Sequence, residues 1–323
     1  MQRTTLRSDL ILLLAAVIWG FAFVAQRIGM DFVEPFTYNG VRFALGTIIL
    51  LPFLFINAGK KEPLIKIGYP DEHGKEPLIK IGYPDEHRKE PLIKTSSPAE
   101  RRKIILGSLA TGLLLFGAVA LQQIGLQETT AGKAGFITGL YVVFVPIVGL
   151  FFGQRSHMTI WIGAVLSVAG LSLLSMTSTF SIAPGDKLVL YCAVIFTFHV
   201  LFIAWLSPRM DSFLLAIIQF AICAFLNLVI AFAIEPVNFD SIMQAWLPIA
   251  YGGILSVGVA YTLQVIAQKT AHPAYASIIL SLEAVFAVLG GWIILNEQLT
   301  GRMIAGCLLM MVGMMIVQVR WKS

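Results

Sequence analysis

The stretch PAYASIILSLEAVFAVLGGWIIL, residues 273–295, contains one charged side chain, Glu283, among 23 residues. About twenty residues in a helix rise roughly 30 Å, the thickness of the hydrocarbon core of a bilayer. Lipid offers no hydrogen-bond partners to the backbone, so a chain that crosses it in this way must be helical. The stretch therefore predicts a membrane-spanning helix that carries one carboxyl group near its middle.

The same pattern recurs along the whole chain. Hydrophobic residues make up 57% of the 323 residues, charged residues only 13%, and the mean hydropathy is +0.82. A soluble protein of this length needs more charges to cover its surface, and the two-residue alternation of a membrane barrel is missing from the sequence. We predict an all-α membrane protein with ten transmembrane helices, at residues 10–29, 36–56, 103–124, 131–153, 157–176, 186–206, 211–234, 246–268, 273–295 and 301–321.

The basic residues predict the orientation of these spans. With the N-terminus inside, the inner segments hold 18 of the 23 lysines and arginines, and 11 of these 18 lie between residues 60 and 103. Basic residues gather on the cytoplasmic side of membrane proteins. We therefore expect a multi-pass protein of the cell inner membrane with both termini in the cytoplasm. The net charge of +5 then reflects topology, and no nucleic-acid partner is expected.

A tandem repeat interrupts the apolar pattern between residues 57 and 102. The unit KEPLIKIGYPDEH occupies residues 61–73 and again 75–87, and a truncated copy, KEPLIK, starts at Lys89. Two prolines in each unit would break a helix, and the charges are mixed. We interpret this segment as a solvated cytoplasmic loop, and a partner-binding role for it stays open.

A second internal similarity relates the two halves of the chain. Spans three to five and eight to ten share these aligned pairs: Gly117 with Gly258, Gln123 with Gln264, Gln127 with Gln268, Thr129 with Thr270, Gly163 with Gly306 and Gly170 with Gly313. Five spans are an odd number, so the second half must enter the membrane inverted. We predict two inverted five-helix repeats, residues 1–176 and 177–323, with a substrate site between them near the midplane.

Four stretches together resemble the drug/metabolite transporter superfamily, in its ten-span form with two EamA domains. They are AVIWGFAFVAQRIG (16–29), VRFALGTIILLP (41–52), GLYVVFVPIVGLFFGQR (139–155) and SLEAVFAVLGGWIILNEQLT (281–300). The resemblance covers nearly the whole chain except the loop at 57–102, and it implies a secondary carrier, commonly an exporter of metabolites, amino acids or drugs. Relatives often carry proline after the glutamate of the last stretch, where this chain has Ala284, so the resemblance does not by itself require a helix break there.

Glu283 is the first candidate for the site. Ala276 precedes it by one heptad and Gly290 follows by one heptad, so that helix face is small and should look into the bundle. A carboxylate at such depth is costly unless it is neutral, paired or hydrated. We expect Glu283 to bind substrate and to be the candidate for proton coupling. The alternative is a protonated carboxyl that bonds a neighbouring helix.

Three further polar side chains fall inside predicted spans. His199 could relay protons or contact substrate, although a lone histidine among phenylalanines is more often a packing residue. Gln123 and Gln264 are mates under the repeat, so they either line a shared polar path or join helices by hydrogen bonds. All three are candidate substrate-binding residues.

The remaining candidates are Arg42, Tyr141 and Trp19. Arg42 lies two turns into the second predicted span, where it either extends outward to the membrane surface or binds an anionic group. Tyr141 belongs to the same polar class, and Trp19 could stack on a substrate from the middle of the first span. Ordinary aromatic packing is the alternative for Trp19.

The sequence carries no phosphate-binding loop, HExxH or GxSxG motif, which disfavours an ATP-driven pump and an intramembrane hydrolase. We therefore expect a secondary-active permease that moves a small metabolite, amino acid or drug by alternating access, with lipid and a small-molecule substrate as its partners. No enzyme activity, cofactor or metal is expected. A membrane-embedded enzyme and a channel or receptor stay open as alternatives. The cargo, the direction, the coupling ion and the oligomeric state are left undetermined.

Overall fold

A computed structural model gives the fold, and it describes residues 6–58, 65–67, 79–81, 92–93, 95, 97–154, 156–175 and 184–318. Helices make up almost all of this part of the chain. In chain order they are α1 (Leu6–Gly29), α2 (Pro35–Ala58), α3 (Pro98–Gly125), α4 (Ala131–Gly139), α5 (Tyr141–Phe151), α6 (Met158–Ser175), α7 (Pro184–Leu206), α8 (Ser212–Ile234), α9 (Phe239–Gln244), α10 (Trp246–Ala250), the π-helix η1 (Tyr251–Tyr261), α11 (Thr262–Ala267), α12 (Pro273–Leu280), α13 (Glu283–Leu295) and α14 (Gly301–Gln318).

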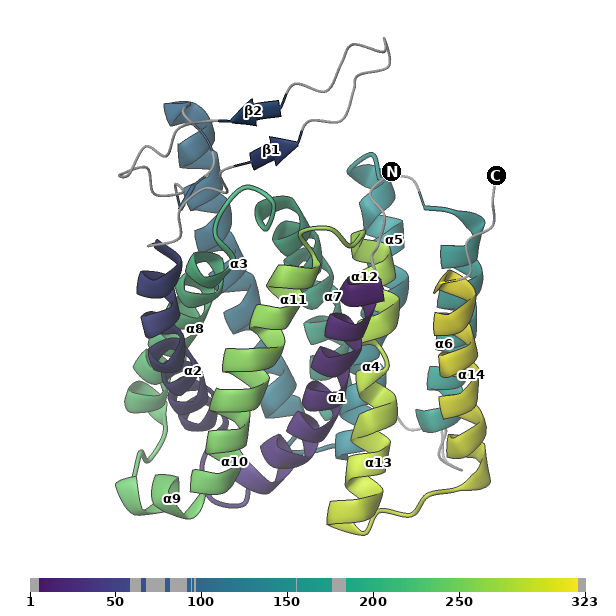
Figure 1. The fold of residues 1–323 in the computed structure, drawn as a ribbon. Coiled ribbons are helices and arrows are strands. Elements are labelled where there is room, and N and C mark those ends of the chain that lie inside the picture. Colours follow the sequence, from purple (N-terminus) through teal and green to yellow (C-terminus); the bar gives the residue numbers. More distant parts are fainter. Residues whose placement is uncertain are drawn as a thin grey trace.

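The membrane character of the prediction is confirmed. Eight helical segments in the described part are long and apolar enough to cross a bilayer, and α6 and α14 are shorter apolar helices. The predicted ten spans coincide with these eight segments and two shorter helices to within a few residues. Figure 1 shows that α1 begins and α14 ends toward the same face of the bundle.

Several helices begin at residues suited to that position. α2, α3, α7 and α12 each start with proline, whose missing N–H is not needed in the first turn. Asp211 caps α8 by accepting the N–H groups of Phe213 and Leu214 at 2.9 and 3.0 Å. Glu235, just after α8, instead accepts the N–H of Thr37 at 2.7 Å and so joins the end of α8 to the start of α2.

The helices pack in pairs drawn from the two halves of the chain: α6 on α14, α2 on α8, α3 on α7, and α1 on α13. Glycines permit the closest of these contacts. A Cβ at Gly170 would lie 2.5 Å from the Gly306 carbonyl oxygen, and one at Gly313 would lie 3.0 Å from the Gly163 carbonyl oxygen. The pairs Gly163 with Gly306 and Gly170 with Gly313 thus lie in one helix seam, as small residues do in membrane bundles.

Three of the membrane segments depart from a regular helix. Leu140 separates α4 from α5, Ser281 and Leu282 separate α12 from α13, and η1 has π-helical geometry between α10 and α11. The break before Glu283 is therefore present although Ala284 stands where relatives often have proline. Local backbone hydrogen bonds replace the helical ones: the N–H of Leu282 bonds the Ile279 carbonyl at 3.2 Å.

Most of the tandem-repeat segment lies outside the described residues, so its interpretation as a solvated loop stays a prediction. Within it, β1 (Ile65–Ile67) and β2 (Ile79–Ile81) pair antiparallel, with Lys66 opposite Lys80. These two lysines occupy the same position in successive repeat units. The pair therefore forms between equivalent segments of the first two copies. Figure 1 shows it on the face where α1 begins.

Candidate functional site

A buried cavity lies where helices of both halves meet. Its walls come from α1, α2, α3, the breaks in α4/α5 and α12/α13, α7, and the segment from η1 to α11. The space open to the centre of a water molecule is about 30 Å³, and one water needs about 10–15 Å³. In this conformation the cavity holds about two waters and is closed to a metabolite.

Five of the seven predicted site residues line this cavity: Trp19, Arg42, Tyr141, Gln264 and Glu283. They come from five separate stretches of sequence, so only the fold brings them together. Gln123 and His199 do not line the cavity. Gln26 and Gln122, which the sequence analysis did not select, do line it.

Glu283 is the first residue of α13, directly after the helix break. Its side chain is 4% exposed, and its Oε1 atom has no hydrogen-bond partner among the described residues. Ala276 and Gly290, one heptad to either side, are also buried, and the helix break at Ser281 and Leu282 lies between Ala276 and Glu283. The carboxyl group is therefore held inside the bundle, where it lines the cavity, and its Oε1 accepts no hydrogen bond from the described residues.

Tyr141 occupies the equivalent place in the other half. It is the first residue of α5, directly after the break at Leu140. Its hydroxyl group is buried close to the Glu283 carboxyl, and Tyr141 Oη also lacks a partner of good hydrogen-bond geometry among the described residues. The two breaks thus place a phenol and a carboxyl side by side in one cavity.

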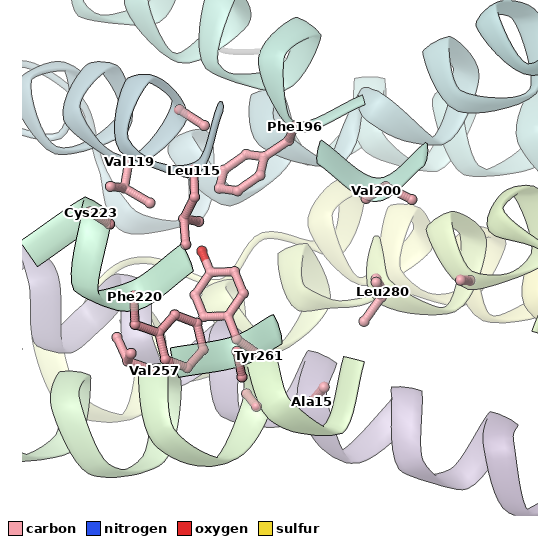
Figure 2. Close-up of a cluster of buried hydrophobic side chains, with 14 of the residues drawn as sticks. Ala15, Leu115, Val119, Phe196, Val200, Phe220, Cys223, Val257, Tyr261 and Leu280 are labelled. Atoms are coloured by element: carbon pink, nitrogen blue, oxygen red, sulfur yellow. The ribbon is translucent and has the colours of Figure 1, made fainter. Parts of the chain in front are cut away.

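Aromatic rings form one wall of the site. The Trp19 indole donates its N–H to the Ser256 carbonyl oxygen at 3.3 Å, which fixes the ring. Its centroid lies 4.6 Å from that of Tyr261. Figure 2 shows Tyr261 among Phe220, Val257 and Phe196, with its hydroxyl directed away from Ala15. Trp19 therefore packs against a neighbouring ring and also lines the cavity.

Arg42 does not extend outward to the membrane surface. It is 2% exposed, and its Nε donates to Asn39 Oδ1 at 3.0 Å. The guanidinium carbon lies 5.3 Å from the Tyr38 ring centroid and 5.1 Å from that of Phe43. No acidic side chain in the described parts of the chain forms an ion pair with it. Burial contradicts the alternative in which Arg42 extends to the membrane surface, and binding of an anionic group stays a prediction.

The glutamine pair is divided between two roles. Gln264 lines the cavity, whereas Gln123 is buried behind it and donates to the Gln26 carbonyl oxygen at 3.4 Å. Its neighbour Gln122 faces the cavity and donates to Thr138 Oγ1 at 3.2 Å. Gln26 follows Trp19 by seven residues, so the heptad rule applied to α1 could have identified it.

His199 stands behind the aromatic wall. Its Nε2 lies 2.8 Å from Gln219 Oε1, and its ring meets that of Tyr261 edge-on at 6.3 Å between centroids. Among the described residues it makes no hydrogen bond to Glu283. His199 is therefore engaged with Gln219 and with the Tyr261 ring.

The comparisons with known proteins agree with this architecture. The EamA-like transporter family model matches residues 6–71, 89–176 and 183–319. A protein of Archaeoglobus fulgidus named as an uncharacterized transporter is 31% identical over 322 residues, which cover 98% of this chain and 87% of that protein. The uncharacterized transporter YoaV of Bacillus subtilis is 23% identical over 303 residues, covering 92% and 91% of the two chains.

A solved crystal structure has the same fold. It superposes with a TM-score of 0.71 over 97% of this chain and 98% of its own, at 17% sequence identity. At that identity the likeness concerns the fold alone.

Proposed function

Because this chain belongs to the EamA-like transporter family, we propose that it is a secondary-active permease that moves a small metabolite, amino acid or drug across the inner membrane, as an exporter. The observation that carries the proposal is the buried cavity at the two helix breaks. It collects polar groups, from both halves of the chain, that have no hydrogen-bond partner among the described residues. Substrate sites between repeats, at broken helices near the midplane, are typical of secondary transporters.

The proposal includes two inverted repeats, residues 1–176 and 177–323. If the halves are exchanged, α7 corresponds to α1, α8 to α2, and η1 with α11 to α3. The contact of α3 with α7 then corresponds to the contact of η1 and α11 with α1, and the contact of α3 with α8 corresponds to that of η1 with α2. The contacts of α2 with α8 and of α6 with α14 map onto themselves. This pattern supports a two-fold relation between the halves that passes through the cavity.

Polar ties at opposite ends of the bundle support alternating access. At one end Asp186, in the first turn of α7, pairs with Lys133 of α4 and accepts a hydrogen bond from Thr129 at 3.1 Å. At the other end Ser8, in the first turn of α1, lies 2.9 Å from Thr270 Oγ1. Thr129 and Thr270 are mates under the repeat. Each tie joins one half to the other, so a conformation open at one end would have to break the tie at that end.

We place both termini in the cytoplasm. The positive-inside distribution of lysines and arginines supports this orientation, and so does the common face at which α1 begins and α14 ends. The Asp186–Lys133 tie then lies on the outer side, and the Ser8–Thr270 tie on the inner side.

Glu283 is the proposed proton-coupling group. A buried carboxyl with an oxygen that no described residue bonds is the kind of group that exchanges a proton or a cation in transporters. Solute binding and proton binding would then compete for the same oxygen atoms, which couples the two movements.

The test starts from a thermal-shift screen of the purified protein against amino acids, nucleotides and drugs, in which a ligand reports itself by stabilisation. The strongest stabiliser is then followed, in labelled form, in proteoliposomes under imposed pH gradients. Wild type, Glu283→Gln and the control Glu297→Gln, a carboxyl outside the cavity, are compared. Wild type and the control should respond to the gradient, and Glu283→Gln should not.

Unchanged pH dependence in Glu283→Gln would overturn the coupling role. Counterflow of the same labelled compound tests the permease itself. Exchange driven by unlabelled solute on the far side is expected of a carrier with alternating access, and flux without counterflow would indicate a channel.

A further inference from the structure

Besides the Tyr141 hydroxyl, three buried oxygen atoms at the cavity have no hydrogen-bond partner among the described residues: Gln26 Oε1, Gln264 Oε1 and Glu283 Oε1. Their side chains are 3%, 2% and 4% exposed. An acceptor left unpaired in a protein interior is destabilising by about 1–3 kcal/mol. Three such acceptors around one space therefore indicate that the occupant of the cavity supplies the donors.

The orientation of Gln26 supports this assignment. Its Nε2 donates to the Ala22 carbonyl oxygen at 3.1 Å, one turn earlier in α1. The nitrogen end of the amide is therefore engaged, and the oxygen end is left without a partner among the described residues. The site presents acceptors from α1, α11 and α13, which belong to both halves of the chain.

Aromatic rings surround the same space. Trp19, Phe196 and Tyr261 all line the cavity, and the Trp19 N–H is already bonded to Ser256. The indole therefore contacts an occupant through its π-system. Ring faces attract cations, and ammonium groups most of all when they are desolvated. A carboxylate with two amide oxygens and several rings matches a compact cation with several N–H donors.

We propose that this cavity binds the ammonium group of an organic amine, with Glu283, Gln26 and Gln264 as acceptors and the Trp19 ring as the adjacent π-surface. The proposal rests on the proposed function only in taking the cavity as the solute site. The fixed cation, Arg42, enters from α2 between Tyr38 and Phe43, whereas Glu283 enters beside Tyr141. The ammonium group therefore occupies the Glu283 side.

Matched pairs of amines and alcohols test the proposal. The thermal midpoint of the purified protein is followed at pH 7 against 2-phenylethylamine and 2-phenylethanol, and against ethanolamine and ethylene glycol. Each pair differs in replacing an ammonium group by a hydroxyl. We expect each amine to bind wild type about tenfold more tightly than its alcohol, because the hydrogen bonds to the ammonium are charge-assisted.

Two variants and a control locate the effect. Glu283→Gln should abolish the preference for the amine. Gln264→Leu, which keeps the carboxyl and removes one acceptor, should reduce the preference by about threefold. The control Glu297→Gln should retain it in full. An amine that binds no better than its alcohol in both pairs overturns the proposal, and so does a preference that survives Glu283→Gln.

Counterflow in proteoliposomes separates this inference from the proposed function. Exchange of a labelled solute without any preference for amines overturns the ammonium site and leaves the permease. Amine binding at Glu283 without exchange of the bound amine leaves the site and overturns the permease.

Discussion

Tyr141 and Glu283 are the first residues of α5 and α13, the second parts of the two broken membrane segments, and both side chains line one cavity. The segments begin at Ala131 and Pro273, so a shift of 142 positions carries each start and each break onto the other. The same break in two related helices therefore presents a phenol from one half and a carboxyl from the other. This difference makes the cavity chemically asymmetric although the two segments break at corresponding positions.

Replacing Tyr141 by phenylalanine separates its functional role from a structural one. The hydroxyl has no partner of good geometry among the described residues, so we expect Tyr141→Phe to change the free energy of unfolding by less than about 1 kcal/mol. Because the hydroxyl lies beside Glu283, exchange of the labelled solute should fall by about three- to tenfold. Denaturant unfolding and counterflow measure the two effects.

Tyr38→Phe is the matched control. The Tyr38 hydroxyl donates to the Pro248 carbonyl oxygen at 2.9 Å, so its loss should destabilise the protein by about 1 kcal/mol or more because a buried acceptor is left unpaired. An equal stability loss in both variants would show that Tyr141 is held by a structural bond.

The ion pair between Lys133 and Asp186 should stabilise the folded protein, with a coupling energy between the two side chains. The Asp186 side chain is 5% exposed and that of Lys133 is 25% exposed. Removing one partner leaves a charge that is partly buried, so Lys133→Met or Asp186→Asn alone should destabilise by about 1–3 kcal/mol, less than a fully buried pair. A double-mutant cycle on thermal or denaturant unfolding measures the coupling energy.

Arg27 and Asp31 provide the comparison for that cycle. Their ion pair, at 3.3 Å, joins side chains that are 38% and 63% exposed, so the same cycle there should give under about 1 kcal/mol. If the two cycles gave equal coupling energies, burial at Asp186 would not strengthen the tie.

The contact of α1 with α13 depends on the absence of a side chain at Gly20. A Cβ there would lie 2.2 Å from the Phe286 Cβ and 2.8 Å from the Glu283 carbonyl oxygen. Gly20→Ala should therefore force the helices apart and lower stability by about 1–3 kcal/mol, with a loss of transport. At Gly117 the nearest atom to an added Cβ is 3.6 Å away. Gly117→Ala should be tolerated, or stabilise the helix slightly, and a similar loss in both variants would contradict the close contact.

The sequence alone was sufficient for the features that depend on length and heptad spacing. The apolar blocks predicted the membrane segments because only a helix satisfies its own backbone in lipid. The small residues Ala276 and Gly290 on either side of Glu283 predicted that the carboxyl faces the interior, where it is buried. These patterns repeat along a helix and need no knowledge of its neighbours.

The details of the cavity required the fold. Gln122 and Gln123 are adjacent, and about 100° of helical rotation sends one to the cavity and the other behind it. No proline marks the break before Glu283, and no sequence pattern distinguishes the π-helix η1 from an α-helix. The place of His199 against Gln219 depends on the packing of α7 and α8. Each of these features is set by a neighbouring helix, which the local sequence does not contain.

His272 predicts how stability changes with pH. It lies just before α12, outside the membrane segment, and its Nδ1 accepts the Ala274 N–H at 3.3 Å. Burial lowers the pKa of His272, and the charge of His157 lowers it further, so the folded protein takes up this proton at lower pH than the unfolded chain does. An ordinary histidine titrates near pH 6.5. The contribution of His272 to stability is therefore complete above about pH 6.5 and is lost as the pH falls below it.

His272→Asn isolates this contribution, because asparagine also caps helices and does not titrate. The thermal midpoint of wild type should fall more than that of the variant between about pH 7.5 and 5.5, and the two should be similar at the upper end. Parallel curves would mean that His272 has the same proton affinity in both states. A difference that grows toward acid pH would link the start of α12, the helix that precedes Glu283, to protonation on the face where the chain begins.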